Sequence, residues 1–428
     1  MKVDFVLCYE HWQRELFALS KVKIELEKKG YKVKLLNIQA GVNDFLEKYF
    51  YEPEVVVFPW VYGDKELCLA RSFKGNVQKV VNMQCEQLLS RRVLNNGFFK
   101  IRGEAKKAYH VSWGKNSYYR FKSYGVQEEN ILDVGNINLE LNKEEYDNLF
   151  YCREQLGRLY GLDINKKWFL FCSNFKFTNA SLIELVGFEE RSSNIFLLRN
   201  QMCKAKKVIL KWMKKYLEDN DDVEIIYRPH PVEKKDPYLE NLALKYSNFK
   251  YISDLSINQW IRVCQRCATW NSTAILDGVS KGVPSRFILP YEMPEILKGD
   301  LDNICDKLTT FEELNNFLKD ECVTNNTTEF QKYIQMDDTI QNFVEQLVNI
   351  HSKDITIFLD EKNRKSEWNV LSREEKCKML VFWASKYIKI ISIINNQDIY
   401  KEAYRIKKRE RELFKGLRRN TYVRFFKE

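Results

Sequence analysis

The sequence has no long uncharged apolar run and no opening segment of the kind that directs export. It begins MKVDFVLCYEHW, with acidic side chains at Asp4 and Glu10, and no stretch of 18 residues is free of charge. An export signal requires a continuous apolar segment, and a membrane-spanning helix requires roughly 20 apolar residues. We therefore expect a cytoplasmic chain without a membrane span. The apolar segment 379–394 contains Lys386 and Lys389, which predicts an amphipathic or buried helix.

Cysteine is present without the spacing of a disulfide framework or a zinc site. The eleven cysteines are an odd number and are scattered among apolar runs, which is typical of reduced thiols in a cytosol. Cys264 and Cys267 form a CxxC pair, but no second ligand pair stands at the spacing that zinc would need. We interpret these two cysteines as core residues.

The sequence also has few residues suited to metal binding. It contains four histidines, and no Asp-x-Asp pair follows a predicted strand. The adjacent acids at 221–222 and 337–338 have the setting of surface loop charges. We expect no metal site and no resident cofactor.

The first 136 residues alternate short apolar runs with helical patterns, and a second series of the same kind follows. Such alternation predicts parallel sheets with crossover helices. In the first series we expect strands at 3–9, 31–38, 55–60, 78–84, 109–114 and 131–136, with helices at 11–29 and 42–50. A helix at 143–161 then leads to strands at 168–174, 223–228, 248–253, 266–271 and 285–290, with helices at 199–218 and 273–281.

These patterns predict an α/β fold of two Rossmann-like domains that face each other across a cleft. The first domain is expected at 1–160 and the second at 161–350, followed by a helical, basic C-terminal extension at 351–428. No internal repeat or low-complexity stretch is present.

The sharpest motif is Arg228-Pro229-His230-Pro231-Val232-Glu233, directly after the predicted strand VEIIYR. Ligands of open α/β sheets bind beyond the carboxyl ends of the strands. The prolines restrict the turn, so that a guanidinium and an imidazole are held stiffly where a phosphate could bind. The alternative is structural: His230 caps a turn and Arg228 is a solvated loop charge.

A second motif, Asn271-Ser272-Thr273, follows a predicted strand and opens a predicted helix that ends near Gly282 and Pro284. Asn271 or Ser272 suits an N-cap, and free amides with two hydroxyls suit an anion. The same residues also cap many helices that bind nothing, so a purely structural role stays open.

Candidate acids and strand-end polar residues complete the set. Glu10 follows the first strand and Glu86 follows the strand near 78–84, where a carboxylate can take the proton of an attacking hydroxyl. A single acid in such a place is commonly a solvated loop charge, which is the alternative. Asn174 and Gly135 also lie at predicted strand ends; glycine permits close approach of a ligand, but a tight turn demands it equally.

Taken together, these motifs resemble a family of bacterial surface carbohydrate biosynthesis proteins with the glycosyltransferase-B (GT-B) fold. The resemblance covers about residues 1–345. It is carried by the following features: Glu10 with Arg14-Glu15, Cys85-Glu86-Gln87, Trp113-Gly114, Gly135-Asn136, Ser173-Asn174-Phe175, the RPHPVE turn, and the Asn-Ser-Thr helix start with Gly282-Val283-Pro284. The RPHP and Asn-Ser-Thr motifs are also similar to the His-Pro and Ser/Thr motifs of transferases that use CMP-sialic acid or CMP-Kdo.

The resemblance implies transfer of a sugar, Kdo or a sialic-acid-like nonulosonic acid, from a CMP donor to a surface polysaccharide or lipid-linked glycan. Glu86, with Glu10 as second choice, is the implied base, and His230 assists the leaving phosphate. The implied nucleotide-binding residues are Arg228, His230, Glu233, Asn271, Ser272, Thr273, Asn174 and Gly135.

The sequence differs from the family in one motif, and two alternative functions are considered. Where those transferases carry two acids and a glycine, this sequence has Cys85-Glu86-Gln87, so only Glu86 corresponds. Related motifs occur in CDP-glycerol phosphotransferases, which makes polyol-phosphate transfer the alternative reaction. A catalytically inactive partner in a glycan assembly complex is the alternative of another class.

The excess positive charge is concentrated at the end of the chain. The net charge is +10, and residues 401–428 hold eleven Lys or Arg against four Glu. Aromatic and aliphatic residues are interspersed, so this segment predicts contact with an anionic inner-membrane surface. The alternative is a final helix that packs on the first domain with its cations solvated. We expect no nucleic-acid partner, because no stacked aromatic platform accompanies the charge.

Overall fold

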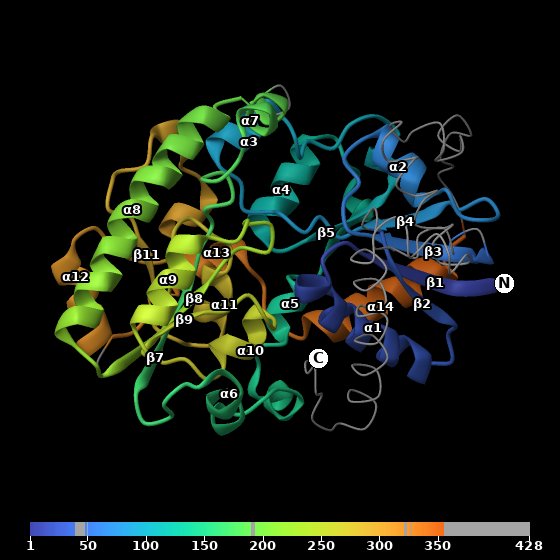
Figure 1. Ribbon diagram of the computed structural model, residues 1–428. Helices are drawn as coiled ribbons and strands as arrows, with labels where there is room; N and C mark the ends of the chain where they lie inside the picture. The colour runs from blue at the N-terminus through green and yellow to red at the C-terminus, as the bar shows by residue number, and fades with distance from the viewer. Residues whose placement is uncertain (39–47, 49, 190–192, 321–322, 326, 355–428) are drawn as a thin grey trace, which may run out of the picture. The chain divides into compact units, whose positions relative to one another are not determined.

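The computed structural model describes residues 1–38, 48, 50–189, 193–320, 323–325 and 327–354. The described chain forms two compact units (Figure 1). Unit 1 contains residues 1–87, 100–141 and the segment that begins at Ile334; unit 2 contains residues 88–99 and 142–333. The predicted boundary near residue 160 therefore lies at Leu141–Asn142. The segment from Ile334 to Ser352, predicted mostly within the second domain, belongs to the first.

Unit 1 is a parallel six-stranded sheet in the order β2-β1-β3-β4-β5-β6. Its strands are β1 (Lys2–Tyr9), β2 (Val33–Asn37), β3 (Glu52–Phe58), β4 (Lys79–Asn82), β5 (Tyr109–Ser112) and β6 (Ile131–Asp133). The central strands are almost wholly buried, as their unbroken apolar runs require in a sheet covered on both faces. Between and after the strands lie η1 (Trp12–Leu16), α1 (Phe17–Lys28), α2 (Asp64–Ala70), η3 (Gly103–Lys107), α4 (Lys115–Ser123), η4 (Glu128–Asn130) and α5 (Ile137–Glu140).

Unit 2 is a second parallel six-stranded sheet, in the order β12-β11-β10-β7-β8-β9. Its strands are β7 (Lys167–Cys172), β8 (Val223–Arg228), β9 (Phe249–Tyr251), β10 (Arg266–Thr269), β11 (Ser285–Ile288) and β12 (Lys307–Leu308). Its helices are α3 (Arg91–Asn96), η5 (Glu144–Leu149), α6 (Arg153–Tyr160), α7 (Leu182–Glu189), α8 (Ile195–Asp219), α9 (Pro237–Lys245), α10 (Ile257–Ile261), α11 (Ile275–Ser280), η6 (Glu295–Leu297), η7 (Asp300–Asn303), α12 (Phe311–Lys319) and α13 (Thr328–Tyr333).

The two sheets confirm the predicted α/β class with two Rossmann-like domains, and every predicted strand is present within a few residues. The predicted helix at 143–161 is divided into η5 and α6, and the predicted helix at 11–29 into a short π-helical turn, η1, and α1. The predicted helix at 42–50 lies almost entirely outside the described residues, as do the helix at 379–394 and the basic segment 401–428. Among the helices that the structure describes, none has the length and apolar character needed to cross a lipid bilayer.

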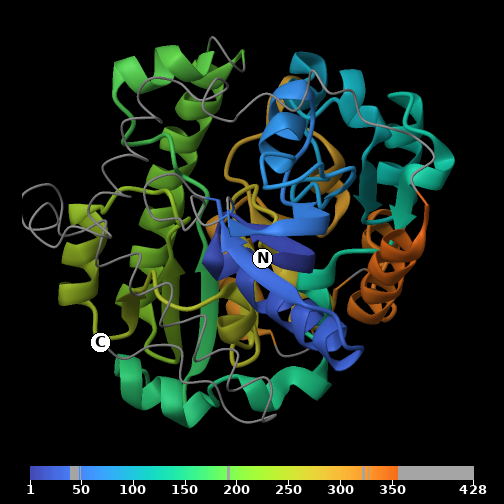
Figure 2. The same ribbon diagram turned by 90° about the vertical axis from the view of Figure 1, so that its right-hand side faces the viewer.

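The last described helix, α14 (Thr339–Ser352), returns to unit 1, where it packs on α1, α5 and β3 (Figure 1 and Figure 2). Its first turn is held by the buried carboxylate of Glu140, whose Oε2 accepts hydrogen bonds from the Thr339 hydroxyl and the Ile340 amide, both at 2.7 Å. Directly before the helix, the Gln335 amide donates to the Trp113 carbonyl at 2.7 Å. Unit 1 is therefore completed by residues about 200 positions beyond its last strand.

Gly135 lies where this returning segment comes closest to the sheet. Its φ is +92°, and a Cβ there would stand 2.5 Å from the Gln335 carbonyl oxygen and 2.6 Å from the Thr339 methyl carbon. Both distances are far inside van der Waals contact. The packing of α14 thus accounts for this glycine, which the sequence analysis assigned to a nucleotide site.

We expect Gly135→Ala to destabilise unit 1 more than Gly282→Ala destabilises unit 2. Both glycines have positive φ, so alanine costs about 1–2 kcal/mol at either position. Nothing stands within 4 Å of a Cβ at Gly282, whereas overpacking at Gly135 should add about 1–3 kcal/mol. Urea unfolding of both variants measures the difference. Equal losses would show that α14 does not restrict this position.

Candidate functional site

In unit 2 the predicted motifs meet at one edge of the sheet. The loops after β7, β8 and β10 all leave carboxyl ends of parallel strands, and β7 pairs with both β8 and β10. From β7 the chain proceeds to β8 on one side and later to β10 on the other, so the strand order reverses at β7. Such a reversal opens a crevice at the carboxyl edge, which is where ligands of open α/β sheets bind.

The carboxylate of Glu233 ties the RPHPVE turn to the loop after β7. Its Oε1 accepts hydrogen bonds from the Ser173 hydroxyl at 2.6 Å, the Phe175 amide at 2.7 Å and the His230 amide at 3.3 Å. Burial raises the pKa of Glu233, although the hydrogen bonds from Ser173 and the backbone oppose this shift. The Glu233 carboxylate thus fixes the turn, and the His230 residue in this turn is half-buried.

The loop after β10 is joined to the same edge through Asn174. The Asn174 side-chain amide donates to the Asn271 carbonyl at 2.7 Å, while its Oδ1 is buried without a hydrogen-bond partner among the described residues. Asn271 has a φ of +45°. Asn271, Ser272 and Thr273 are all half-buried, so each residue is partly accessible to solvent.

The helix that this loop opens is shorter than predicted. α11 begins at Ile275 and has six residues, and the Ser272 hydroxyl accepts from the Ala274 amide at 3.3 Å. Ser272 therefore stabilises the turn before the helix. Gly282 ends the segment in the left-handed region, as predicted.

Arg228, the last residue of β8, is buried beneath the edge. Its guanidinium donates to the Leu255 carbonyl, and only 8% of the residue is exposed. Burial lowers the pKa of Arg228, against the opposing charge of the nearby Asp277 carboxylate. Arg228 thus binds the loop that follows β9, and its predicted contact with a phosphate stays a prediction.

Asp277 is a buried acid that was not among the residues predicted from the sequence. Its Oδ1 accepts from the Asn142 and Asn258 side-chain amides, each at 3.2 Å. Burial raises its pKa to about 7, although Asn142, Arg228 and Arg262 oppose this shift. The signal that could have identified it is an acid placed among apolar residues in AILDG, immediately after a strand-end loop.

In unit 1 the predicted acids also gather at a carboxyl edge. Arg14 links two of them: its guanidinium donates to Glu86 Oε1 at 2.8 Å and to Glu15 Oε1 at 3.1 Å. Glu15 is buried and its Oε2 accepts from the Glu10 amide at 2.7 Å. Burial opposes a charged guanidinium here, but the carboxylates of Glu86 and Glu15 raise the pKa of Arg14 overall.

Glu10 belongs to the same cluster and has different contacts. It lies where the strand order reverses between β1 and β3. Its Oε2 accepts from the Trp60 indole at 3.1 Å and lies 3.9 Å from His11 Nε2. The Glu10 and Glu86 side chains are each about one-third exposed, at 33% and 35%. The cluster therefore holds two partly exposed carboxylates. Glu86 is bound by the Arg14 guanidinium, and Glu10 is bound by the neutral Trp60 indole.

The remaining predictions concern cysteines and metals. Cys264 and Cys267 are buried, free thiols, and burial raises their pKa, which confirms their interpretation as core residues. Asp221, Asp222, Asp337 and Asp338 are exposed, as expected of surface charges. Within the described ranges, no three His, Cys, Asp or Glu side chains are grouped closely enough to hold a metal ion.

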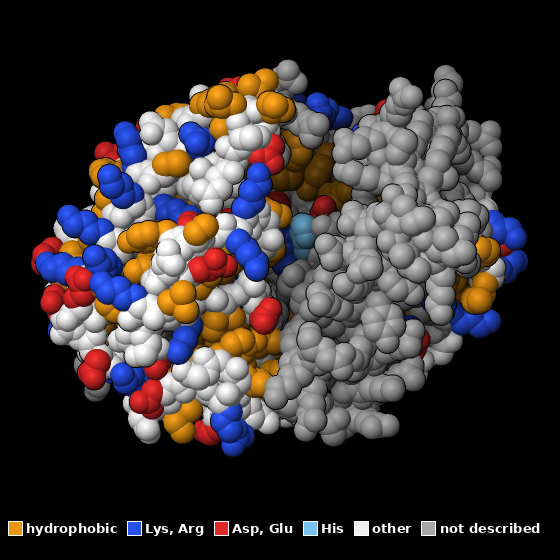
Figure 3. Space-filling view, in the orientation of Figure 1, with side chains coloured by type: hydrophobic (Ala, Val, Ile, Leu, Met, Phe, Trp, Pro, Cys, Tyr) orange, Lys and Arg blue, Asp and Glu red, His pale blue; other side chains and the backbone are white. Residues whose placement is uncertain are grey.

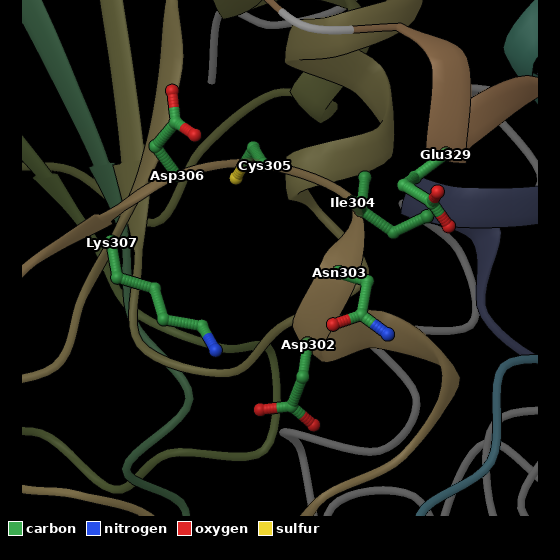
Figure 4. A pocket seen from close by; sticks show the side chains of 7 residues that line it. All are labelled: Asp302, Asn303, Ile304, Cys305, Asp306, Lys307 and Glu329. Atoms are coloured by element: carbon green, nitrogen blue, oxygen red, sulfur yellow. The ribbon is translucent and has the colours of Figure 1, made fainter.

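A separate hollow of about 650 Å³ in unit 2 includes none of the predicted residues. It lies at the amino end of β12, whereas the predicted motifs follow the carboxyl ends of their strands. Figure 4 shows Asp306 and Lys307 on one side of it and Asn303, Ile304 and Glu329 on the other. This mixed-charge lining shares no residue with the RPHPVE or Asn-Ser-Thr loops.

Comparison with known proteins shows the fold. No protein-family model matches the chain, and no curated protein matches it. Among solved structures, S. aureus MnaA with UDP has a TM-score of 0.51 and 15% identity, over 84% of this chain and 100% of the other. UDP-GlcNAc 2-epimerase from Neisseria meningitidis, bound to UDP-GlcNAc, has a TM-score of 0.51 and 13% identity, over 82% and 100%. The chain thus has a GT-B-like pair of Rossmann-like domains.

The raised pKa of Asp277 predicts a pH dependence of stability. The folded protein keeps this carboxyl protonated up to about pH 7, while the unfolded chain loses the proton near pH 4. Between these values the folded state binds more protons, so its stability falls as pH rises and the loss is complete above pH 7. Asp277→Asn should remove about 2 kcal/mol of this decline between pH 5 and 8.

Urea unfolding of the wild-type chain and of Asp277→Asn at several pH values measures this effect. Asp221→Asn, at an exposed site in the same unit, is the control and should follow the wild type. Parallel curves for wild type and Asp277→Asn would contradict the assignment.

Proposed function

We propose that this protein transfers a sugar from a nucleotide-activated donor to a hydroxyl group of a surface glycan. The donor phosphate would bind at the carboxyl edge of the unit 2 sheet, and a carboxylate of the unit 1 cluster would take the acceptor proton. Kdo or a nonulosonic acid from a CMP donor is the first candidate substrate, because the RPHP and Asn-Ser-Thr motifs resemble those of transferases that use such donors.

One observation carries this proposal: three loops are joined at the reversal point of the unit 2 sheet. Glu233 fixes the RPHPVE turn against the loop after β7, and Asn174 fixes that loop to Asn271. Around these contacts lie an imidazole, two hydroxyls and a buried amide oxygen that has no hydrogen-bond partner within the described part of the chain. Preorganised polar groups of this kind can stabilise a leaving phosphate without reorganising during the reaction.

The GT-B-like fold and its solved relatives are consistent with a nucleotide ligand. The two relatives contain UDP or UDP-GlcNAc, so uridine nucleotides belong beside cytidine nucleotides in any test of the donor. The proposed donor contacts are with the phosphate, which cytidine and uridine nucleotides have in common. CDP-glycerol is the donor for the alternative reaction, polyol-phosphate transfer.

In unit 1, Glu86 is the first candidate for the base and Glu10 the second. Arg14 binds one oxygen of Glu86, which orients a carboxylate that is 35% exposed. Glu10 is held by the Trp60 indole. Arg14 is then a positioning residue, because it acts through Glu86.

We expect His230→Ala to weaken nucleotide binding about 10- to 100-fold and to reduce turnover by at least as much, since a charge-assisted contact contributes roughly 1.5–3 kcal/mol. Ser272→Ala and Thr273→Ala should give smaller losses. Calorimetric titration with CMP, UDP and their sugar conjugates measures the affinity.

Val232→Ala is the matched control, because Val232 is 53% exposed in the same turn and should bind as the wild type does. Unfolding temperatures establish that each variant is folded. Wild-type affinity and turnover in folded His230→Ala would exclude a phosphate role for this imidazole.

We expect Glu86→Gln to lower turnover by about 10²- to 10⁴-fold and to leave nucleotide affinity unchanged, because a general base acts on the acceptor. Glu129→Gln, at an exposed acid of unit 1, is the control. If Glu10→Gln is inactive and Glu86→Gln is active, Glu10 is the general base. If both variants are active, the proposed mechanism is refuted.

The same assays separate the alternatives. Turnover with CDP-glycerol but not with nucleotide sugars would assign polyol-phosphate transfer. Conversion of UDP-GlcNAc in the absence of any acceptor would assign epimerisation instead of transfer. Binding of nucleotides without turnover of any donor would favour an inactive assembly partner.

A further inference from the structure

Unit 2 exposes an apolar surface on α7 and the start of α8. Ile183 is 86% exposed, Leu182 71%, Val186 50% and Phe196 43%. Leu185, on the opposite side of α7, is buried against the unit. Figure 3 shows a hydrophobic, orange area at the top of the view, where Figure 1 places α7. We call these four residues the apolar tip.

The solvent face of α8 continues from the apolar tip as a row of lysines. Lys204, Lys207 and Lys211 are all exposed, and at about 100° per residue they lie within about 80° of Phe196 around the helix. The opposite face of α8 is buried. Within the part of the chain that the structure describes, none of the three lysines has an acidic partner. We call them the lysine row.

Two acids of α7, at positions that the structure describes, have partners outside the apolar tip and the lysine row. Glu184 accepts from the Lys234 ammonium at 3.0 Å and from the Ser181 amide at 2.7 Å. Glu189 accepts from the amides of Asn194 and Ile195, at 2.8 and 2.6 Å. The surface therefore presents apolar groups and uncompensated positive charge together.

We propose that the apolar tip and the lysine row dock unit 2 on an anionic membrane surface. The lysines would contact lipid headgroups, and the four apolar side chains would enter the interface between headgroups and acyl chains. A soluble acidic polymer would account for the lysines but not for a tip of leucine, isoleucine, valine and phenylalanine. A second copy of this surface would repel the first, because both carry the lysine row.

Helix geometry adds a constraint on the docked orientation. At a rise of about 1.5 Å per residue, Lys211 lies roughly 22 Å along the axis from Phe196. Both can reach a flat surface only if α8 lies nearly parallel to the membrane. All three lysines should then contribute, including the one farthest from the apolar tip. This inference does not depend on the proposed reaction.

Sedimentation of the full-length protein with vesicles tests the proposal. Vesicles of phosphatidylcholine with phosphatidylglycerol, at low salt, should bind the wild type, and vesicles of phosphatidylcholine alone should bind it far less. Each lysine near an anionic surface contributes on the order of fivefold, so Lys204→Gln/Lys207→Gln/Lys211→Gln should weaken binding on the order of 100-fold. Ile183→Asp should weaken it at least tenfold.

Two matched controls use exposed residues outside this surface. Leu244 in α9 is 86% exposed, as Ile183 is, and Leu244→Asp should leave binding unchanged. Lys65→Gln/Lys307→Gln/Lys319→Gln removes three other exposed lysines and should reduce binding only slightly.

Several outcomes would overturn the proposal. Wild-type binding by both the lysine and the Ile183 variants would show that another segment, such as residues 401–428, makes the contact. Loss of binding in the lysine variant alone, with equal binding of the wild type and Ile183→Asp to dextran sulfate, would assign the surface to an acidic polymer. Because vesicle binding requires no turnover, its failure is distinguishable from failure of the proposed reaction.

Discussion

The arrangement of the candidate donor site depends on one carboxylate. Glu233 accepts three hydrogen bonds on a single oxygen, from the loop after β7 and from its own turn. The carboxylate is half-buried, and these donors offset part of its desolvation. This carboxylate therefore links the loops that follow two neighbouring strands, and it accepts from the His230 amide at the reversal point of the sheet.

In unit 1 an acidic side chain also fixes the loop that follows a strand. Glu15 is buried, accepts the Glu10 amide, and is paired with Arg14, which in turn holds Glu86. In each unit an acid, buried Glu15 in unit 1 and half-buried Glu233 in unit 2, therefore orders the loop that follows the first strand of its sheet. His230 and Glu10 contact that acid directly through their amides, and Glu86 is linked to it through Arg14. This division separates residues that support the loops from residues available for chemistry.

The long helix α8 has two faces with different roles. Its apolar side builds unit 2, and Lys206 on its flank pairs with Asp236 at 2.6 Å, near the start of α9. Its outer side carries the lysine row and begins beside the apolar tip. The carboxyl edge of the sheet, with the RPHPVE and Asn-Ser-Thr loops, is formed by other elements of the unit. A surface contact made on the outer side of α8 therefore does not use those loops.

The sequence by itself determined the strands, because continuous apolar runs such as those of β3 and β7 are specific to buried parallel strands. It also placed His230, Ser272, Asn174, Glu10 and Glu86 at strand ends. Only the tertiary structure decided which of these meet, because their contacts join residues up to about 100 positions apart, as in Asn174 with Asn271. It also returned α14 to unit 1, assigned Gly135 to that packing, and buried Arg228 and Asp277. Burial and distant pairing arise when the whole sheet assembles, so local pattern could not reveal them.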